Sequence, residues 1–218
     1  MPRRALAEHR PYLLLSLLAG ISYYFVADGA IGGLWLMLWK GAAVGFLALY
    51  AVRRGQGVNA RLLAIVLAIC ALADMILEVS FLAGGALFAA AHLIAIGLYW
   101  RNRRPARTPS QSAAAVALVL MVPLIAGLLT FPLPNWELAA GYATIVGAMA
   151  AAAWISHFPR YRVGVGAVFF VLSDLLIFAR EAGTGADAIA DLLIWPLYFG
   201  GQFLIATGVI DAVRRSPA

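Results

Sequence analysis

The chain has 218 residues, of which 64% are hydrophobic and 12% charged. Soluble globular domains contain about 45–50% apolar residues, so this composition excludes an ordinary soluble domain. The net charge of +6, from 16 basic and 10 acidic residues, could suggest nucleic-acid binding. The distribution of these charges along the chain, given below, argues against it. The single cysteine, Cys70, cannot form an intrachain disulfide.

The apolar residues fall in about eight blocks of about 17–24 residues, the length that spans a hydrocarbon core of about 30 Å. The blocks cover residues 11–28, 33–52, 60–80, 82–100, 112–131, 136–157, 161–180 and 189–212. Little chain remains between them for a soluble domain. We therefore predict an all-α polytopic membrane helical bundle that forms a single transmembrane domain over residues 1–218. The first block is long and has no small-x-small cleavage site, so we interpret it as a retained helix and not a signal peptide.

Basic residues gather at alternate ends of these blocks. They are Arg3, Arg4, Arg10, Arg53, Arg54, Arg61, Arg101, Arg103, Arg104, Arg107, Arg160, Arg162, Arg214 and Arg215. The opposite loops carry Asp28, Glu78, Glu137, Glu181, Asp187 and Asp191, with only Arg180. By the positive-inside rule both termini are predicted to be cytoplasmic. The charge thus reports topology and argues against a nucleic-acid partner, and the composition is compatible with a bacterial inner membrane.

Three ionisable residues lie inside otherwise apolar blocks: Lys40, Asp74 and Asp174. Each is about a dozen residues from a predicted cytoplasmic arginine, which places it roughly 18–20 Å above the same membrane face. A charge at that depth costs roughly 2.5–3.5 kcal/mol or more and usually serves a function. We expect the three to share one polar site, with Lys40 as the partner of Asp174; a pair that only fixes helix register is the alternative.

Five further polar residues are candidates for the same site. Glu78 follows Asp74 by four residues and shares its helix face, but a solvated carboxylate at the outer boundary is an equally good interpretation. Ser173 either contributes to the site or satisfies a carbonyl one turn back. His92 lies near the midplane, where it either packs across helices or orients a carboxylate. Tyr198 and Gln202 share a stripe of the last block.

Metal and cofactor motifs are poorly supported. Only His92 of the three histidines lies in the core, so a zinc site would lack the usual multi-histidine ligation, and we predict no metal and no cofactor. The sequence contains no HExxH, GxSxG, P-loop or GxGxxG motif. A Ser–His–Asp arrangement that uses Ser173 and His92 remains an alternative.

The ordered set of polar segments resembles the YhhN family of lysoplasmalogenase-like membrane proteins. The segments are Lys40-Gly41, Ala73-Asp74, Gly84-Gly85 through His92, Gly166 through Ser173-Asp174, and Leu197-Tyr198 through Gln202. The order, spacing and eight-span frame match the family over most of the chain. In two places the chain departs from the family pattern: Gly41 stands where a proline follows the lysine, and Ala95 where a tyrosine is frequent.

This resemblance implies hydrolysis of the vinyl ether bond of a lysoplasmalogen, which releases a fatty aldehyde and a glycerophospho-ethanolamine or -choline. Such a reaction needs one protonated carboxylic acid and one carboxylate. Burial raises the pKa of a carboxyl group and a nearby lysine lowers it, so two carboxylates and one lysine can divide these roles. We predict Asp74 and Asp174 as this pair. Lys40, Glu78, His92, Ser173, Tyr198 and Gln202 are predicted to bind or orient the lipid or water.

Other functions remain open at this stage. Intramembrane Asp and Lys also mark proton-coupled carriers, although we find no pair of Gly/Pro-interrupted half-helices at corresponding positions. A non-catalytic lipid-binding protein, or a hydrolase of an ester or amide in another lysolipid, would use the same residue types. The expected partners are a lysophospholipid substrate and membrane lipid, and the sequence does not give the oligomeric state.

Overall fold

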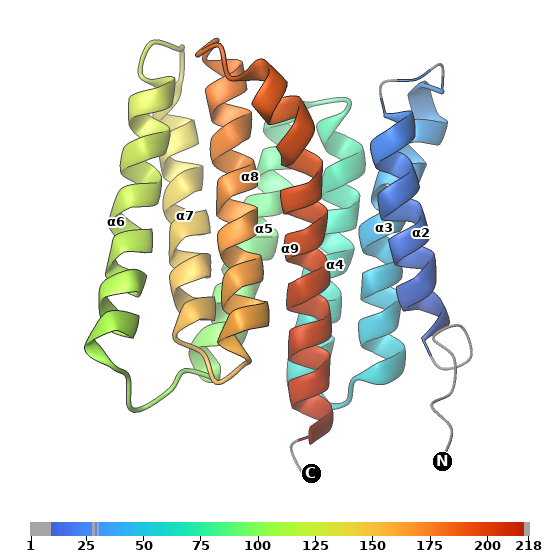
Figure 1. Ribbon diagram of the computed structural model, residues 1–218, viewed down its shortest axis with the longest axis vertical. Helices are drawn as coiled ribbons and strands as arrows, with labels where there is room; N and C mark the ends of the chain where they lie inside the picture. The colour runs from blue at the N-terminus through green and yellow to red at the C-terminus, as the bar shows by residue number, and fades with distance from the viewer. Residues whose placement is uncertain (1–9, 28, 30, 216–218) are drawn as a thin grey trace. The chain divides into compact units, whose positions relative to one another are not determined.

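The computed structural model of the protein describes residues 10–27, 29 and 31–215. Within them the chain forms eight α-helices and one π-helical turn, and no strand. The helices are α2 (Pro11–Val26), α3 (Gly33–Arg54), α4 (Gly57–Leu77), α5 (Phe81–Arg101), α6 (Pro109–Thr130), α7 (Trp136–Trp154), α8 (Val165–Glu181) and α9 (Asp187–Arg215), with the π-helical η1 (Arg160–Gly164) before α8 (Figure 1). The predicted all-α helical bundle is confirmed. Arg3, Arg4 and Asp28 lie outside the described residues.

The helices are long enough to form a polytopic membrane protein. Seven of them, from α3 to α9 with η1 counted into α8, have the length and apolar composition to cross a membrane. The first, α2, has 16 residues and is shorter, about 24 Å at 1.5 Å per residue. In several places the helices extend beyond the apolar blocks. For example, α9 begins two residues before its block and ends three after it, because polar residues continue a helix outside the hydrocarbon.

Local sequence signals account for several helix ends. Pro11 and Pro109 occupy the first turns of α2 and α6, where a missing N–H costs nothing. Thr108 caps α6 in a reciprocal capping box with Gln111, which satisfies two backbone donors. The tight turn between α3 and α4 places Gly57 at φ +77°, a left-handed conformation that glycine adopts without strain.

By its internal contacts the chain forms two compact units, residues 1–91 with 210–218, and residues 92–209. We describe each by itself; whether they form one transmembrane domain stays a prediction. In the first unit, α2 packs on α3 and α3 on α4 (Figure 1). Ser16 Oγ donates to the carbonyl of Ala43 at 2.6 Å. A Cβ on Gly41 would lie 2.7 Å from Met75 Cγ and 3.0 Å from the Ala71 carbonyl oxygen. Glycine therefore lets α3 and α4 approach closely, and α3 continues through Gly41 without a break.

In the second unit, α6 packs on α7 and α8, and glycines set the contact between α8 and α9. A Cβ on Gly201 would lie 2.6 Å from the carbonyl oxygen of Gly166, and a Cβ on Gly166 would lie 2.7 Å from the carbonyl oxygen of Gly201. Two turns further along α9, a Cβ on Gly208 would lie 2.6 Å from Val163 Cγ2. Membrane helices pack closely at such small residues because lipid provides no hydrophobic drive for association.

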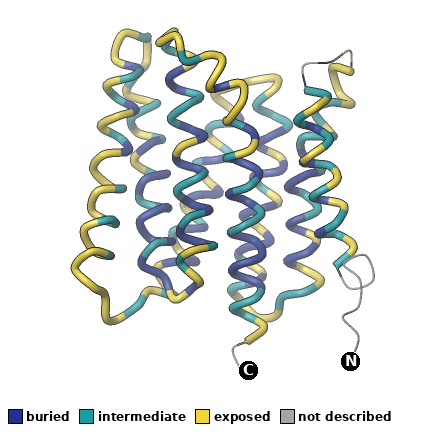
Figure 2. Tube along the Cα trace, viewed as in Figure 1, coloured by how far each residue is buried: buried dark blue, intermediate teal, exposed yellow. Residues whose placement is uncertain are grey.

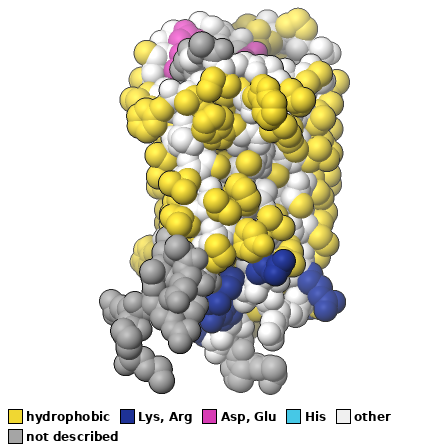
Figure 3. Space-filling view, turned by 90° about the vertical axis from the view of Figure 1, so that its right-hand side faces the viewer, with side chains coloured by type: hydrophobic (Ala, Val, Ile, Leu, Met, Phe, Trp, Pro, Cys, Tyr) yellow, Lys and Arg dark blue, Asp and Glu magenta, His cyan; other side chains and the backbone are white. Residues whose placement is uncertain are grey.

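The exposed surface is apolar along the middle of the helices. Figure 2 shows α6 as the helix with the most exposed residues, whereas α7, α8 and α9 carry long buried stretches. On the face drawn in Figure 3, hydrophobic side chains cover the middle, with basic side chains at one end and acidic side chains at the other. This distribution is what a chain solvated by lipid between two polar layers requires.

The contact between α8 and α9 predicts opposite effects for two neighbouring glycines. Gly201→Ala would force the two helix backbones apart, and we expect a loss of about 1–3 kcal/mol in the free energy of unfolding. Gly200→Ala is the matched control, because a Cβ on Gly200 meets nothing within 4 Å, and alanine is the better helix former. Thermal unfolding in detergent measures both; equal midpoints would contradict this account of the contact.

Candidate functional site

Lys40 and Glu78 form an ion pair in the first unit. Lys40 Nζ lies 2.5 Å from Glu78 Oε1, and the two side chains are 14% and 37% exposed. The sequence led us to expect Asp174 as the partner of Lys40. Within its own unit, Lys40 is instead paired with the carboxylate that ends the neighbouring helix α4, at its C-cap. Glu78 is therefore part of a polar pair, although its side chain stays partly exposed at the end of α4.

Asp74 lies one turn before Glu78 on α4 and is buried. It is 2% exposed, so the helix presents a buried carboxyl group and a half-exposed, lysine-paired carboxylate on one face. The catalytic role of Asp74 stays a prediction.

Asp174 lies inside α8 of the second unit and accepts a hydrogen bond from a tyrosine. Tyr142 Oη, on α7, donates to Asp174 Oδ2 at 2.9 Å, and Asp174 is only 9% exposed. Sequence reasoning missed Tyr142. The available signal was a tyrosine placed several residues inside the Ala- and Gly-rich α7, away from the interface where tyrosines usually gather.

Aromatic rings surround this hydrogen bond and connect three of the predicted residues. The His92 ring meets Phe170 edge-to-face at 4.6 Å between centroids and lies 6.1 Å from the Tyr142 ring. Phe170 in turn meets Tyr198 at 5.2 Å. His92, Asp174 and Tyr198 thus belong to one cluster in the second unit, as expected, but Tyr142 and Phe170 are the residues that join them. We call these five residues the Asp174 cluster.

Ser173 and Gln202 have different surroundings. Ser173 Oγ donates to the carbonyl of Ile194 on α9 at 3.0 Å, so its hydroxyl joins two helices and does not return to its own helix. Gln202 is 3% exposed and follows Gly201 at the close contact of α8 with α9. The hydrogen bond to Ile194 gives Ser173 a packing role, which leaves the Ser–His–Asp alternative without support.

The charges of the Asp174 cluster are limited to one carboxyl group. Its other polar groups are two phenols and an imidazole, and its remaining member is the ring of Phe170. Among the described residues no three His, Cys, Asp or Glu side chains gather as metal ligands. The cluster is therefore suited to proton transfer with stabilisation of a cation by aromatic faces.

These features define a polytopic helical membrane protein with buried carboxyl groups in its spans. A family model for the YhhN family matches residues 35–209, and the chain belongs to this family. The matched range contains all eight predicted site residues. No curated protein and no solved structure matches the chain.

The ion pair predicts energetic coupling between its two residues. Because both side chains are at least partly shielded, we expect Lys40→Met and Glu78→Gln to be less destabilising together than the sum of the single changes, with a coupling of about 0.5–1 kcal/mol. Unfolding midpoints of the four proteins of the cycle, at low and high salt, measure it. Strict additivity would show that the contact contributes nothing to stability.

Proposed function

We propose that the protein is an integral-membrane hydrolase that cleaves the vinyl ether bond of lysoplasmalogen-type lysolipids. The products are a fatty aldehyde and a glycerophospho-head group. The observation that carries the proposal is the buried carboxyl group of Asp174, hydrogen-bonded to Tyr142 and bordered by aromatic rings. Membership of the YhhN family agrees with it. We further propose that the chain resides in a bacterial inner membrane.

Hydrolysis of a vinyl ether begins with protonation of carbon. A proton is added to the alkenyl carbon beyond the one that bears oxygen, and the positive charge is shared between the other alkenyl carbon and the ether oxygen. Water then adds to this oxocarbenium ion and loses a proton. The hemiacetal that results divides into the aldehyde and the glycerol hydroxyl, so one water molecule is consumed in all.

Asp174 is the acid in this proposal. Tyr142 donates to one carboxyl oxygen, Oδ2, which leaves the other oxygen to carry the proton that is transferred. The aromatic rings next to Tyr142 suit the developing cation, because the face of an aromatic ring attracts positive charge. His92 and Tyr198 orient the lipid or water in the same cluster.

Asp74 stays the predicted base that takes the proton from water. The sequence suggested that Lys40 would keep one aspartate ionised, but Lys40 is already neutralised by Glu78. We propose instead that Lys40 and Glu78 bind the head group. A lysine suits its phosphate, and a carboxylate suits an ethanolamine or choline cation. Within the second unit, Ser173 positions α8 against α9, and Gln202 stays a predicted orienting residue.

Asp174→Asn and Asp74→Asn are each expected to lower aldehyde release from a lysoplasmalogen by at least about a hundredfold, within the range for loss of a catalytic acid or base. Tyr142→Phe should have a smaller effect, because it removes only a hydrogen bond to the acid. Asp191→Asn is the control, since Asp191 is exposed and pairs with Arg180. Activity of purified, monodisperse protein in detergent measures these effects, and turnover close to wild type in Asp174→Asn would refute the assignment.

Protonation of carbon leaves a label in the product. In D₂O the released aldehyde should carry one deuterium on the carbon next to the carbonyl group, and the rate should fall because a proton moves in the first step. Mass spectrometry of the trapped aldehyde measures the label. An unlabelled aldehyde would exclude this route.

The alternative functions give different results. Flux across liposomes without any product would favour a carrier, and binding of lipid without product would favour a lipid-binding protein.

A further inference from the structure

A second polar cluster lies in the second unit, at the end opposite to its carboxylates. It is formed where the loop after α5 meets the loop before η1. The backbone N–H of His157 donates to the carbonyl of Asn102 at 2.7 Å, and the backbone N–H of Arg104 donates to the carbonyl of Ile155 at 3.0 Å. Two loops distant in sequence are thus tied together by backbone hydrogen bonds, which fixes the side chains that they carry.

Two guanidinium groups are held in this cluster by main-chain carbonyls. Arg104 Nη2 donates to the carbonyl of Phe158 at 3.3 Å. Arg160 Nε donates to the carbonyl of Trp154 at 3.4 Å, and its guanidinium lies 5.8 Å from the centre of the Trp154 ring. The guanidinium group of each arginine is therefore held in place by a main-chain carbonyl and does not extend freely into solvent.

The two guanidinium groups lie close enough to repel each other. Burial lowers the pKa of Arg104, and the positive charge of Arg160 lowers it further. The carboxylates of this unit provide no compensation. Glu137 lies at the start of α7, Asp174 and Glu181 lie in the second half of α8, and Asp187 and Asp191 lie at the start of α9. Positive charge therefore accumulates at this end without an acidic side chain of the unit to balance it.

Two donors in the same cluster are buried and have no acceptor among the described residues: Arg160 Nη2 and Trp154 Nε1. Buried donors of this kind are rare in native proteins, and a bound ion is one of the explanations for them. The neighbouring η1 is π-helical, a feature that occurs frequently at functional sites. An anion bound here would accept hydrogen bonds from these donors and would reduce the repulsion between the guanidinium groups of Arg104 and Arg160.

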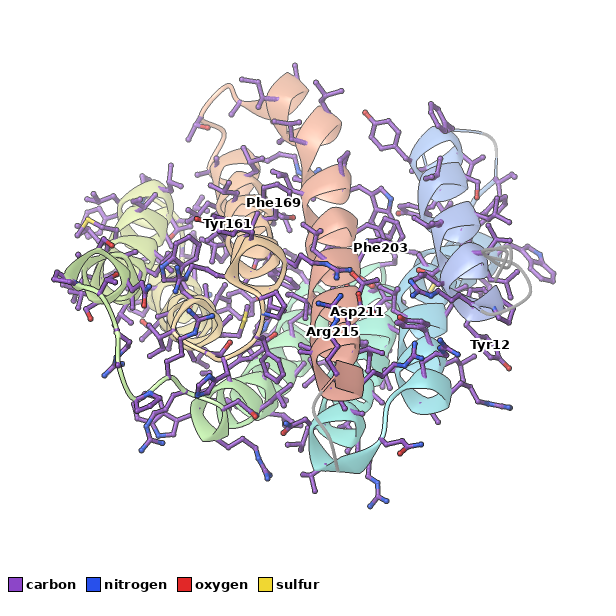
Figure 4. All side chains as sticks on the ribbon, turned by 60° about the horizontal axis from the view of Figure 1, so that its bottom comes forward. Tyr12, Tyr161, Phe169, Phe203, Asp211 and Arg215 are labelled. Carbon is purple, nitrogen blue, oxygen red and sulfur yellow. The ribbon has the colours of Figure 1, made fainter. Side chains whose placement is uncertain are left out.

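We propose that Arg104, Arg160 and Trp154 form a binding site for a phosphate group, of the kind carried by the head group of an anionic phospholipid. Arginine pairs with phosphate through parallel hydrogen bonds, and basic sites at the cytoplasmic ends of membrane helices bind lipid head groups. Tyr161 of η1, 83% exposed and labelled in Figure 4, provides an aromatic ring at the same end. Aromatic residues of this kind are frequent at the level of the head groups. The site is separate from the proposed hydrolase chemistry and does not depend on it.

Binding is tested with delipidated full-length protein in a neutral detergent, to which phosphatidylglycerol, phosphatidylcholine or inorganic phosphate is added. The readouts are the shift of the unfolding midpoint and the number of lipids retained in native mass spectrometry. We expect phosphatidylglycerol to raise the midpoint and to be retained, with no effect of inorganic phosphate at the same concentration. Arg104→Gln and Arg160→Gln should each weaken lipid binding by about tenfold or more, as expected for a charge-assisted hydrogen bond.

Two variants make the test specific. Trp154→Phe keeps the aromatic ring but removes the Nε1 donor, and should weaken binding without a change of charge. Arg107→Gln is the matched control, because it removes an exposed arginine of the same loop and should leave binding unchanged. Each lipid-induced shift is compared with the lipid-free midpoint of the same variant, so a less stable variant still reports on binding.

An equal effect of inorganic phosphate would support the site and identify a soluble phosphate as its occupant. Phosphatidylcholine carries a phosphate but no net charge, so binding as tight as that of phosphatidylglycerol would support phosphate recognition without selection for anionic lipid. Equal losses in Arg107→Gln and Arg160→Gln, or unchanged binding in both Arg160→Gln and Trp154→Phe, would overturn the proposal.

Discussion

Hydrocarbon offers no hydrogen-bond partner, so each polar group inside a membrane span depends on another group of the protein. This constraint explains the bonds found in the spans. Ser16 and Ser173 donate to carbonyls of neighbouring helices, Lys40 pairs with Glu78, and Tyr142 donates to Asp174. Each of these bonds joins two helices, so the groups that are most costly to bury are also those that hold the helices in register. Glycines complete the packing by allowing the backbones to approach.

The bonds differ in what they leave available. The hydroxyl of Ser173 is used in joining α8 to α9, and the charge of Lys40 is balanced within its own unit. Asp174 accepts a hydrogen bond on one carboxyl oxygen and has aromatic rings nearby, and its other oxygen is the one that carries the transferred proton in the proposed function. The hydrogen-bond partners of a buried polar group therefore indicate whether it serves packing or is available for chemistry. Burial alone does not distinguish the two.

Much of the fold follows from the sequence because length and hydropathy are strong signals in membrane proteins. The eight apolar blocks correspond to eight helices, and Asp74, His92 and Asp174 are buried within them. Side-chain partners were harder to predict. Depth alone cannot decide which carboxylate faces Lys40, since the rotation of α3 about its axis is set by the packing of Gly41 against α4. Tyr142 was missed because its position inside α7 marks it as unusual but does not identify Asp174 as its partner.

Of the seven helices long enough to span a membrane, α6 is the least buried. Only Val122, Ala126 and Thr130 of its 22 residues are buried, so most of the helix is solvated by lipid. Lipid accepts almost any apolar side chain, whereas a protein neighbour accepts few shapes. The exposed positions of α6 are therefore expected to tolerate most apolar substitutions, unlike those that face α7 and α8. Residues in the helices that are surrounded by protein must fit their neighbours. Substitutions in those helices therefore affect packing and function more than substitutions on the exposed face of α6.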